Sequence, residues 1–132
     1  VSNYGTVLVT IADMDKPTAL PLIRRFYELG FNIEATEGTA NFLKKHGIRT
    51  RIRAKLTSDG SDEILMALRQ GHISYVINTI DVSHGDSHSD GSEIRRAAVE
   101  NNVTMFTSLD TVKVLLDVLE EITLGVSTID AE

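Results

Sequence analysis

The sequence predicts an α/β fold, a three-layer α/β/α sandwich with a five-stranded parallel sheet. Five short apolar runs alternate along the chain with segments whose apolar residues recur at helical spacing. Strands that alternate with helices in this way form right-handed βαβ units, with helices on both faces of the sheet. At 132 residues the chain is large enough for one hydrophobic core.

The composition of the chain argues against several classes of function. The net charge of −6 argues against nucleic acid as a partner, because nucleic acids are bound by basic surfaces. Without cysteine there are no disulfides, and any metal site would depend on histidine and carboxylates. No apolar run is long enough to span a bilayer and residues 1–10 lack signal-peptide character, so we expect a cytoplasmic protein without a membrane partner.

The first half of the chain begins with a buried strand at residues 7–11, a short run of β-branched and apolar residues. A helix follows from Lys16, with Pro21 expected near its start and Gly30 as a left-handed cap at its end. The next strand covers residues 31–35. We expect a short helix over residues 39–46, closed by a glycine.

In the second half, residues 48–54 alternate apolar and basic side chains, which is typical of an edge strand with one wet face. Later elements are a helix at 61–69, a strand at 74–80, a polar loop at 83–92, a helix from Ser92 to Asn101 and a strand at 103–106. Ser108 caps a final helix that we expect to end near Thr123.

Ligands of such sheets bind beyond the carboxyl ends of the strands. The loops there carry two lysines, several hydroxyls and an amide, which together favour a phosphate site; these residues are Thr10, Lys16, Thr36, Thr39, Lys55, Asn78 and Thr79. Gly38 lies at a predicted helix start, whose backbone N–H groups attract anions. The alternative interpretation is that Thr36 or Thr39 only caps that helix.

The order of several motifs resembles that of the methylglyoxal-synthase-like domain, most closely the C-terminal allosteric domain of the carbamoyl phosphate synthetase large subunit. The motifs are VTIADMDK, ATEGTA, GIRTRIRAK, YVINT, IRR and FTSLDT. The resemblance implies a Rossmann/flavodoxin-like fold and a nucleotide monophosphate site. Its phosphate-binding positions fall on Lys16, Thr36, Thr39 and Lys55, and its ribose and base positions on Thr10, Asn78 and Thr79.

The same resemblance implies a regulatory domain with no catalytic residue, metal or cofactor of its own. UMP is the favoured effector, with IMP and 5-phosphoribosyl 1-pyrophosphate as other candidates. Its partners would be the synthetase domains of the same chain, which use ATP, Mg²⁺ or Mn²⁺ and K⁺, and the glutaminase small subunit. Such an enzyme makes carbamoyl phosphate for pyrimidine, and in some cases arginine, biosynthesis. We expect a linker at 1–6, the domain at 7–123 and a tail at 124–132.

The sequence also allows three other interpretations. Methylglyoxal synthase acts on dihydroxyacetone phosphate and keeps a catalytic Asp near Asp62, but its paired glutamines and its proline, histidine and aspartate cluster are not matched. A receiver domain also has acids after its first strand, but needs an Asp near Lys55. A docking module without a ligand is the third.

The segment SHGDSHSD suggests a metal site at His84, Asp86, His88 and Asp90, but a polar loop is the simpler interpretation.

Overall fold

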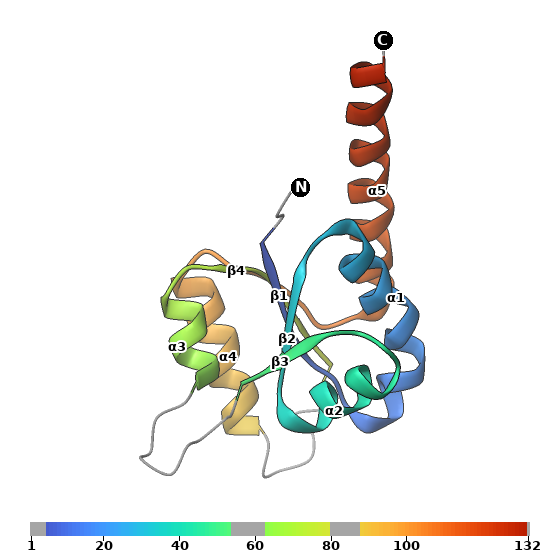
Figure 1. The fold of residues 1–132 in the computed structure, drawn as a ribbon. Coiled ribbons are helices and arrows are strands. Elements are labelled where there is room, and N and C mark those ends of the chain that lie inside the picture. Colours follow the sequence, from blue (N-terminus) through green and yellow to red (C-terminus); the bar gives the residue numbers. More distant parts are fainter. Residues whose placement is uncertain (1–4, 54–62, 80–87, 132) are drawn as a thin grey trace.

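The computed structural model describes residues 5–53, 63–79 and 88–131. In that part of the chain five parallel strands form one sheet in the order β3-β2-β1-β4-β5, which confirms the predicted architecture (Figure 1). The strands are β1 (Thr6–Thr10), β2 (Asn32–Ala35), β3 (Thr50–Ile52), β4 (Ile73–Asn78) and β5 (Thr104–Phe106). The basic and apolar alternation at 48–54 correctly predicted an edge strand, because β3 lies at the end of the sheet.

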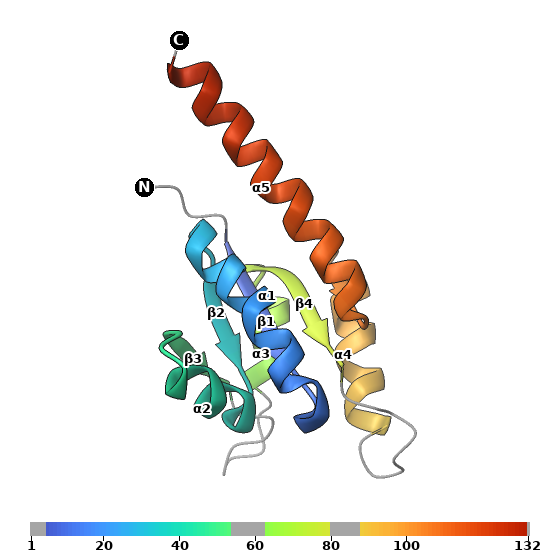
Figure 2. The same ribbon diagram turned by 90° about the vertical axis from the view of Figure 1, so that its right-hand side faces the viewer.

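Helices cover both faces of the sheet (Figures 1 and 2). One face carries α1 (Lys16–Leu29), α2 (Glu37–Lys45) and α5 (Leu109–Ala131), and the other carries α3 (Glu63–Arg69) and α4 (His88–Glu100). A single 3-10 turn, η1 (Asp13–Asp15), precedes α1. Gly30 ends α1 with a φ of 107°, the left-handed conformation that the sequence indicated.

The core is divided by the sheet into two apolar layers. Side chains of Val7 and Val9 on β1 pack with Phe26 of α1 and Leu116 of α5, and all four are fully buried. Leu8, between them in sequence, points to the other layer beneath α3 and α4. This alternation follows from the two-residue period of a strand. As a result β1 is apolar on both sides, as expected for a central strand.

Helix α5 extends beyond the rest of the domain (Figure 2). Arg25 of α1 binds the middle of α5. Its guanidinium group donates hydrogen bonds to Asp117 at 2.8 Å and to Glu120 at 2.7 and 2.9 Å. The bond from Arg25 keeps the pKa of the Glu120 carboxyl below its ordinary value. The pair is partly exposed, so its contribution to stability is small, about 1 kcal/mol or less.

Several helix limits differ from those expected. α2 begins at Glu37, two residues before the predicted start at Thr39, so Thr39 lies inside its first turn. α4 begins at His88, so Ser92 lies within the helix and is not its cap. The polar run at 83–92 indicated a loop, but the one glycine that falls within α4 costs a helix only about 1 kcal/mol, which the packing of α4 can offset. α5 continues to Ala131, where we expected a tail after Thr123.

Pro21 is farther inside α1 than we expected, at its sixth residue. A proline there removes one backbone hydrogen bond, the one whose acceptor would be Pro17. The packing of Ile23 and Phe26 in the core offsets that cost, since both are almost fully buried. No helix in the described ranges has the length and apolar character needed to cross a membrane.

Phe26 provides a test of the packing between α1 and the sheet. Its ring is fully buried and meets Phe31 edge to face, with ring centroids 5.3 Å apart. We expect Phe26→Ala to lower the free energy of unfolding by about 3–5 kcal/mol. The adjacent Tyr27 is 38% exposed, so Tyr27→Ala should cost about 1 kcal/mol or less. Urea denaturation followed by circular dichroism measures both, and equal losses would contradict this packing.

Candidate functional site

The strand order reverses at β1, because the chain moves from β1 outward to β2 and β3 and then returns to β4 on the other side. The ends of three strands therefore meet: Val9 pairs with Ala35, and Thr10 with Asn78. Such a reversal is where open α/β sheets bind ligands. The predicted site residues that the structure describes lie at or directly after the ends of these strands, or at the starts of α1 and α2.

Lys16 brings a positive charge to the start of α2. A Cβ built on Gly38 would lie 3.7 Å from the Lys16 Nζ atom, so the ammonium group lies beside the first turn of that helix. The first backbone N–H groups of α2 have no partner within the helix. Glycine at this point leaves that backbone accessible, and the ammonium group and the helix dipole favour the same kind of ligand, an anion.

Asp13 shares this site, which the sequence did not reveal. Its carboxylate accepts a hydrogen bond from the Lys16 ammonium group. That bond and the charge of Lys16 hold the pKa of the Asp13 carboxyl below its ordinary value, so this carboxyl is ionised at neutral pH. Asp13 is 94% exposed, and an incoming phosphate would compete with it for Lys16.

Thr36 and Thr39 differ in their surroundings. Thr36 occupies the N-cap position of α2 with a ψ of 161°, and its hydroxyl makes no capping hydrogen bond. Thr39 is 3% exposed, and its Oγ1 accepts from the Ile11 N–H at 3.3 Å and donates to the Ile11 carbonyl at 3.5 Å. Thr39 thus connects α2 to the loop after β1, a structural role that sequence reasoning missed. A phosphate contact at Thr39 stays a prediction.

The predicted ribose and base positions lie deeper. Thr10 is fully buried, and within the described part of the chain its Oγ1 has no hydrogen-bond partner. Asn78, opposite it on β4, is 4% exposed. Thr79, which directly follows β4, connects that strand to the loop after β1, because its Oγ1 accepts a hydrogen bond from the Ala12 N–H at 3.1 Å. Thr10 and Asn78 are therefore two buried polar residues side by side at the carboxyl ends of β1 and β4.

A cavity of about 300 Å³ opens next to Thr79. Its other walls come from η1 and from the start of α5, and it is lined by Asp15, Thr79, Thr107, Ser108, Leu109 and Asp110. Ser108 caps α5 as predicted, since its Oγ accepts from the Asp110 N–H at 3.2 Å. The volume is at the lower limit of small-molecule sites, and sequence reasoning did not include the two carboxylates.

Lys55, the second predicted phosphate-binding lysine, lies outside the described residues, as does Asp62. The same holds for His84 and Asp86, and no side chain is described for His88 or Asp90. Within the described ranges no three His, Asp or Glu side chains are grouped so that they could hold a metal ion.

Comparison with known families identifies the class of protein. The chain matches the family described as the MGS-like domain over residues 18–107, about two thirds of its length. This protein therefore belongs to the MGS-like domain family. The match includes Thr36, Thr39, Lys55, Asn78 and Thr79 but begins after Lys16.

Solved structures confirm the fold. One similar structure is a methylglyoxal synthase from Elizabethkingia anophelis NUHP1, with 20% identity over 85% of this chain and 76% of that chain, at a TM-score of 0.70. Another is ForH, with 21% identity over 89% of this chain and 80% of that chain, at a TM-score of 0.63.

The bond between Thr39 and Ile11 can be tested by removing one hydroxyl. Thr39→Val keeps the shape of the side chain but leaves the Ile11 N–H without its acceptor. We expect a loss of about 1–3 kcal/mol in the free energy of unfolding. Thr36→Val is the matched control, with an expected loss of about 0.5 kcal/mol or less, because Thr36 makes no capping bond. Chemical denaturation compares the two, and a stable Thr39→Val would contradict the assignment.

Proposed function

We propose that this domain is a regulatory nucleotide-monophosphate-binding domain of the large chain of a glutamine-hydrolysing carbamoyl phosphate synthetase. The favoured effector is UMP acting as an inhibitor, with IMP and 5-phosphoribosyl 1-pyrophosphate as the alternatives. The observation that carries the proposal is the Lys16 ammonium group beside Gly38 at the start of α2. The order of motifs from VTIADMDK to FTSLDT supports the assignment to this enzyme.

The chemistry of a phosphate monoester fits these residues. Near neutral pH the group carries almost two negative charges and presents three acceptor oxygens. Lys16, the Thr36 hydroxyl and the N–H groups at the start of α2 can donate to those oxygens, and Lys55 would add a second ammonium group. The ribose and base would extend over Thr10 and Asn78 toward the cavity beside Thr79. In this proposal the domain itself catalyses no reaction.

Regulation would act through the rest of the enzyme. A bound nucleotide shifts the synthetase only if its affinity differs between the active and inactive forms of the whole enzyme, typically by about 1–3 kcal/mol. In this scheme ATP, divalent metal and K⁺ serve the synthetase domains, the small subunit supplies ammonia from glutamine, and the enzyme is cytoplasmic. The outer face of α5, with Val114, Val118 and Ile122 exposed one turn apart, is the apolar surface available for docking on those domains.

The proposal predicts that UMP binds this domain through Lys16. Calorimetric titration should show saturable binding of UMP and none of uridine, because the phosphate provides the charge. Lys16→Gln should weaken UMP binding by about 10- to 100-fold, the usual loss for a charge-assisted hydrogen bond. Lys44→Gln is the matched control, since Lys44 is exposed at the other end of α2, and it should bind UMP normally.

The outcomes separate this proposal from its rivals. Equal affinity of Lys16→Gln and the unchanged protein would remove Lys16 from the site. Binding of IMP in preference to UMP would keep the site and change the effector. Formation of methylglyoxal from dihydroxyacetone phosphate would replace the regulatory domain with an enzyme.

Asp13 provides an independent test because its effect has the opposite sign. Its carboxylate occupies the Lys16 ammonium group and repels a phosphate. We expect Asp13→Asn to tighten UMP binding by about twofold to fivefold, the scale of an exposed ion pair. Asp117→Asn, on α5, is the control for the change in net charge and should leave UMP affinity as it was. Weaker binding by Asp13→Asn would mean that Asp13 is a ligand and not a competitor.

A further inference from the structure

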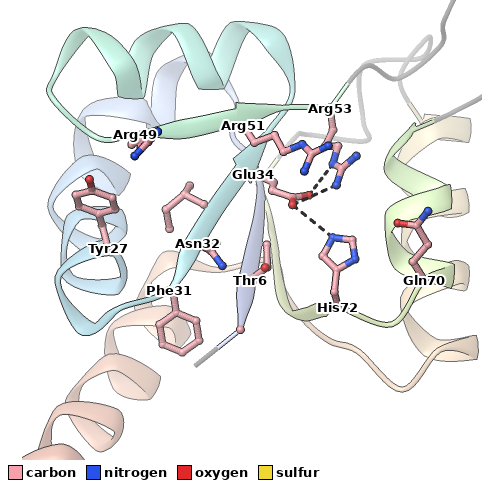
Figure 3. A pocket seen from close by; sticks show the side chains of 12 residues that line it. Thr6, Tyr27, Phe31, Asn32, Glu34, Arg49, Arg51, Arg53, Gln70 and His72 are labelled. Carbon is pink, nitrogen blue, oxygen red and sulfur yellow. Dashed lines mark hydrogen bonds and ion pairs between the residues drawn. The ribbon is translucent and has the colours of Figure 1, made fainter. Parts of the chain in front are cut away.

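A second polar cavity, of about 840 Å³, lies along β2 and β3 and reaches Tyr27 of α1 (Figure 3). The apolar layer beneath α3 and α4 includes Leu8 and Val76, on β1 and β4, but no residue of β2 or β3. At the same level of the sheet, β2 carries Glu34, which pairs with Leu8 of β1, and β3 carries Arg51, which pairs with Glu34. The helices of the described chain therefore leave this part of the sheet uncovered, and its side chains are charged. We call this cavity the β2–β3 groove.

The floor of the β2–β3 groove is a preformed ionic cluster. Glu34 is only 5% exposed and accepts two hydrogen bonds from Arg53, at 2.7 and 3.3 Å. The Nε2 atom of His72 lies 3.4 Å from the same carboxylate, and Figure 3 shows both partners converging on it. The guanidinium group pairs with the carboxylate in a bidentate manner, a geometry that holds both side chains in place. Arg53 is thereby neutralised by Glu34.

Two further arginines line the β2–β3 groove without such a partner. Arg49 and Arg51 are exposed, and neither makes a hydrogen bond or an ion pair within the described residues. Arg51 lies within β3, and Arg49 and Arg53 directly precede and follow that strand, so in an extended chain the three residues recur at intervals of about 6.6 Å. In a chain of net charge −6, this row is a local excess of positive charge.

From this arrangement we propose that the β2–β3 groove binds an acidic polypeptide segment in extended conformation, with carboxylates at every second residue. An extended peptide repeats its side chains at the same interval of about 6.6 Å, so successive carboxylates can reach successive guanidinium groups. A compact anion would engage fewer of these guanidinium groups than an extended chain, because Arg49 lies apart from Arg51 and Arg53 (Figure 3).

The test uses a short fluorescein-labelled peptide in which glutamate alternates with threonine, titrated with the 132-residue protein and followed by fluorescence anisotropy. We expect saturable binding that weakens as salt rises. Arg51→Glu and Arg49→Glu should each weaken it by about tenfold or more. Arg95→Glu, an exposed arginine of α4 with the same change in charge, should leave it unchanged. The same peptide with lysine in place of glutamate should not bind.

Further readouts locate the peptide and exclude other occupants. Amide chemical shifts should change at Thr6, Asn32 and His72, which line the β2–β3 groove, and thermal melting should show that Arg51→Glu is folded. No binding of the glutamate peptide, or equal binding by Arg51→Glu and Arg95→Glu, would overturn the proposal. So would preferential binding of single-stranded oligothymidylate. Self-association of the protein that Arg51→Glu abolishes would assign the groove to a second copy and also overturn the proposed occupant.

Discussion

Burial of β1 on both faces is the constraint on which the other features depend. Val7, Leu8 and Val9 are each fully covered, by α1 and α5 on one side and by α3 and α4 on the other. Because β2 and β4 flank β1 and all three strands are parallel, the loops that follow them meet at one edge. The start of α2 is then joined to the end of β1 by the Thr39 hydroxyl, and Lys16 lies beside that joint.

The two candidate binding regions differ in how positive charge is presented. At the carboxyl edge, the described residues provide one ammonium group, the positive end of α2 and hydroxyls, with Asp13 as a local competitor. That arrangement suits a small, dense charge such as a phosphate. The β2–β3 groove instead presents a row of guanidinium groups above the buried Glu34, which suits charge spread along a chain. In an acidic protein, these local arrangements and not the net charge decide which anions bind.

Sequence patterns predicted most of the fold because they report local physics. The glycine at 30 indicated a helix end, the alternation at 48–54 indicated an edge strand, and Ser108 indicated a cap; the structure contains all three. Patterns failed where two local signals conflicted. The polar composition at 83–92 indicated a loop, but α4 begins within that run, at His88. Thr36 and Thr39 looked equivalent, yet only Thr39 is turned inward to Ile11, because it lies one turn into α2.

By itself, the sequence determined the alternation of strands and helices, the parallel sheet and the edge where ligands of this fold bind. Those properties follow from the period and composition of short segments. The tertiary structure alone decided which distant side chains meet: Lys16 with the start of α2, Thr39 with Ile11, and Arg53 and His72 with Glu34. Such contacts depend on strand register and side-chain direction, which become defined only when the segments pack together.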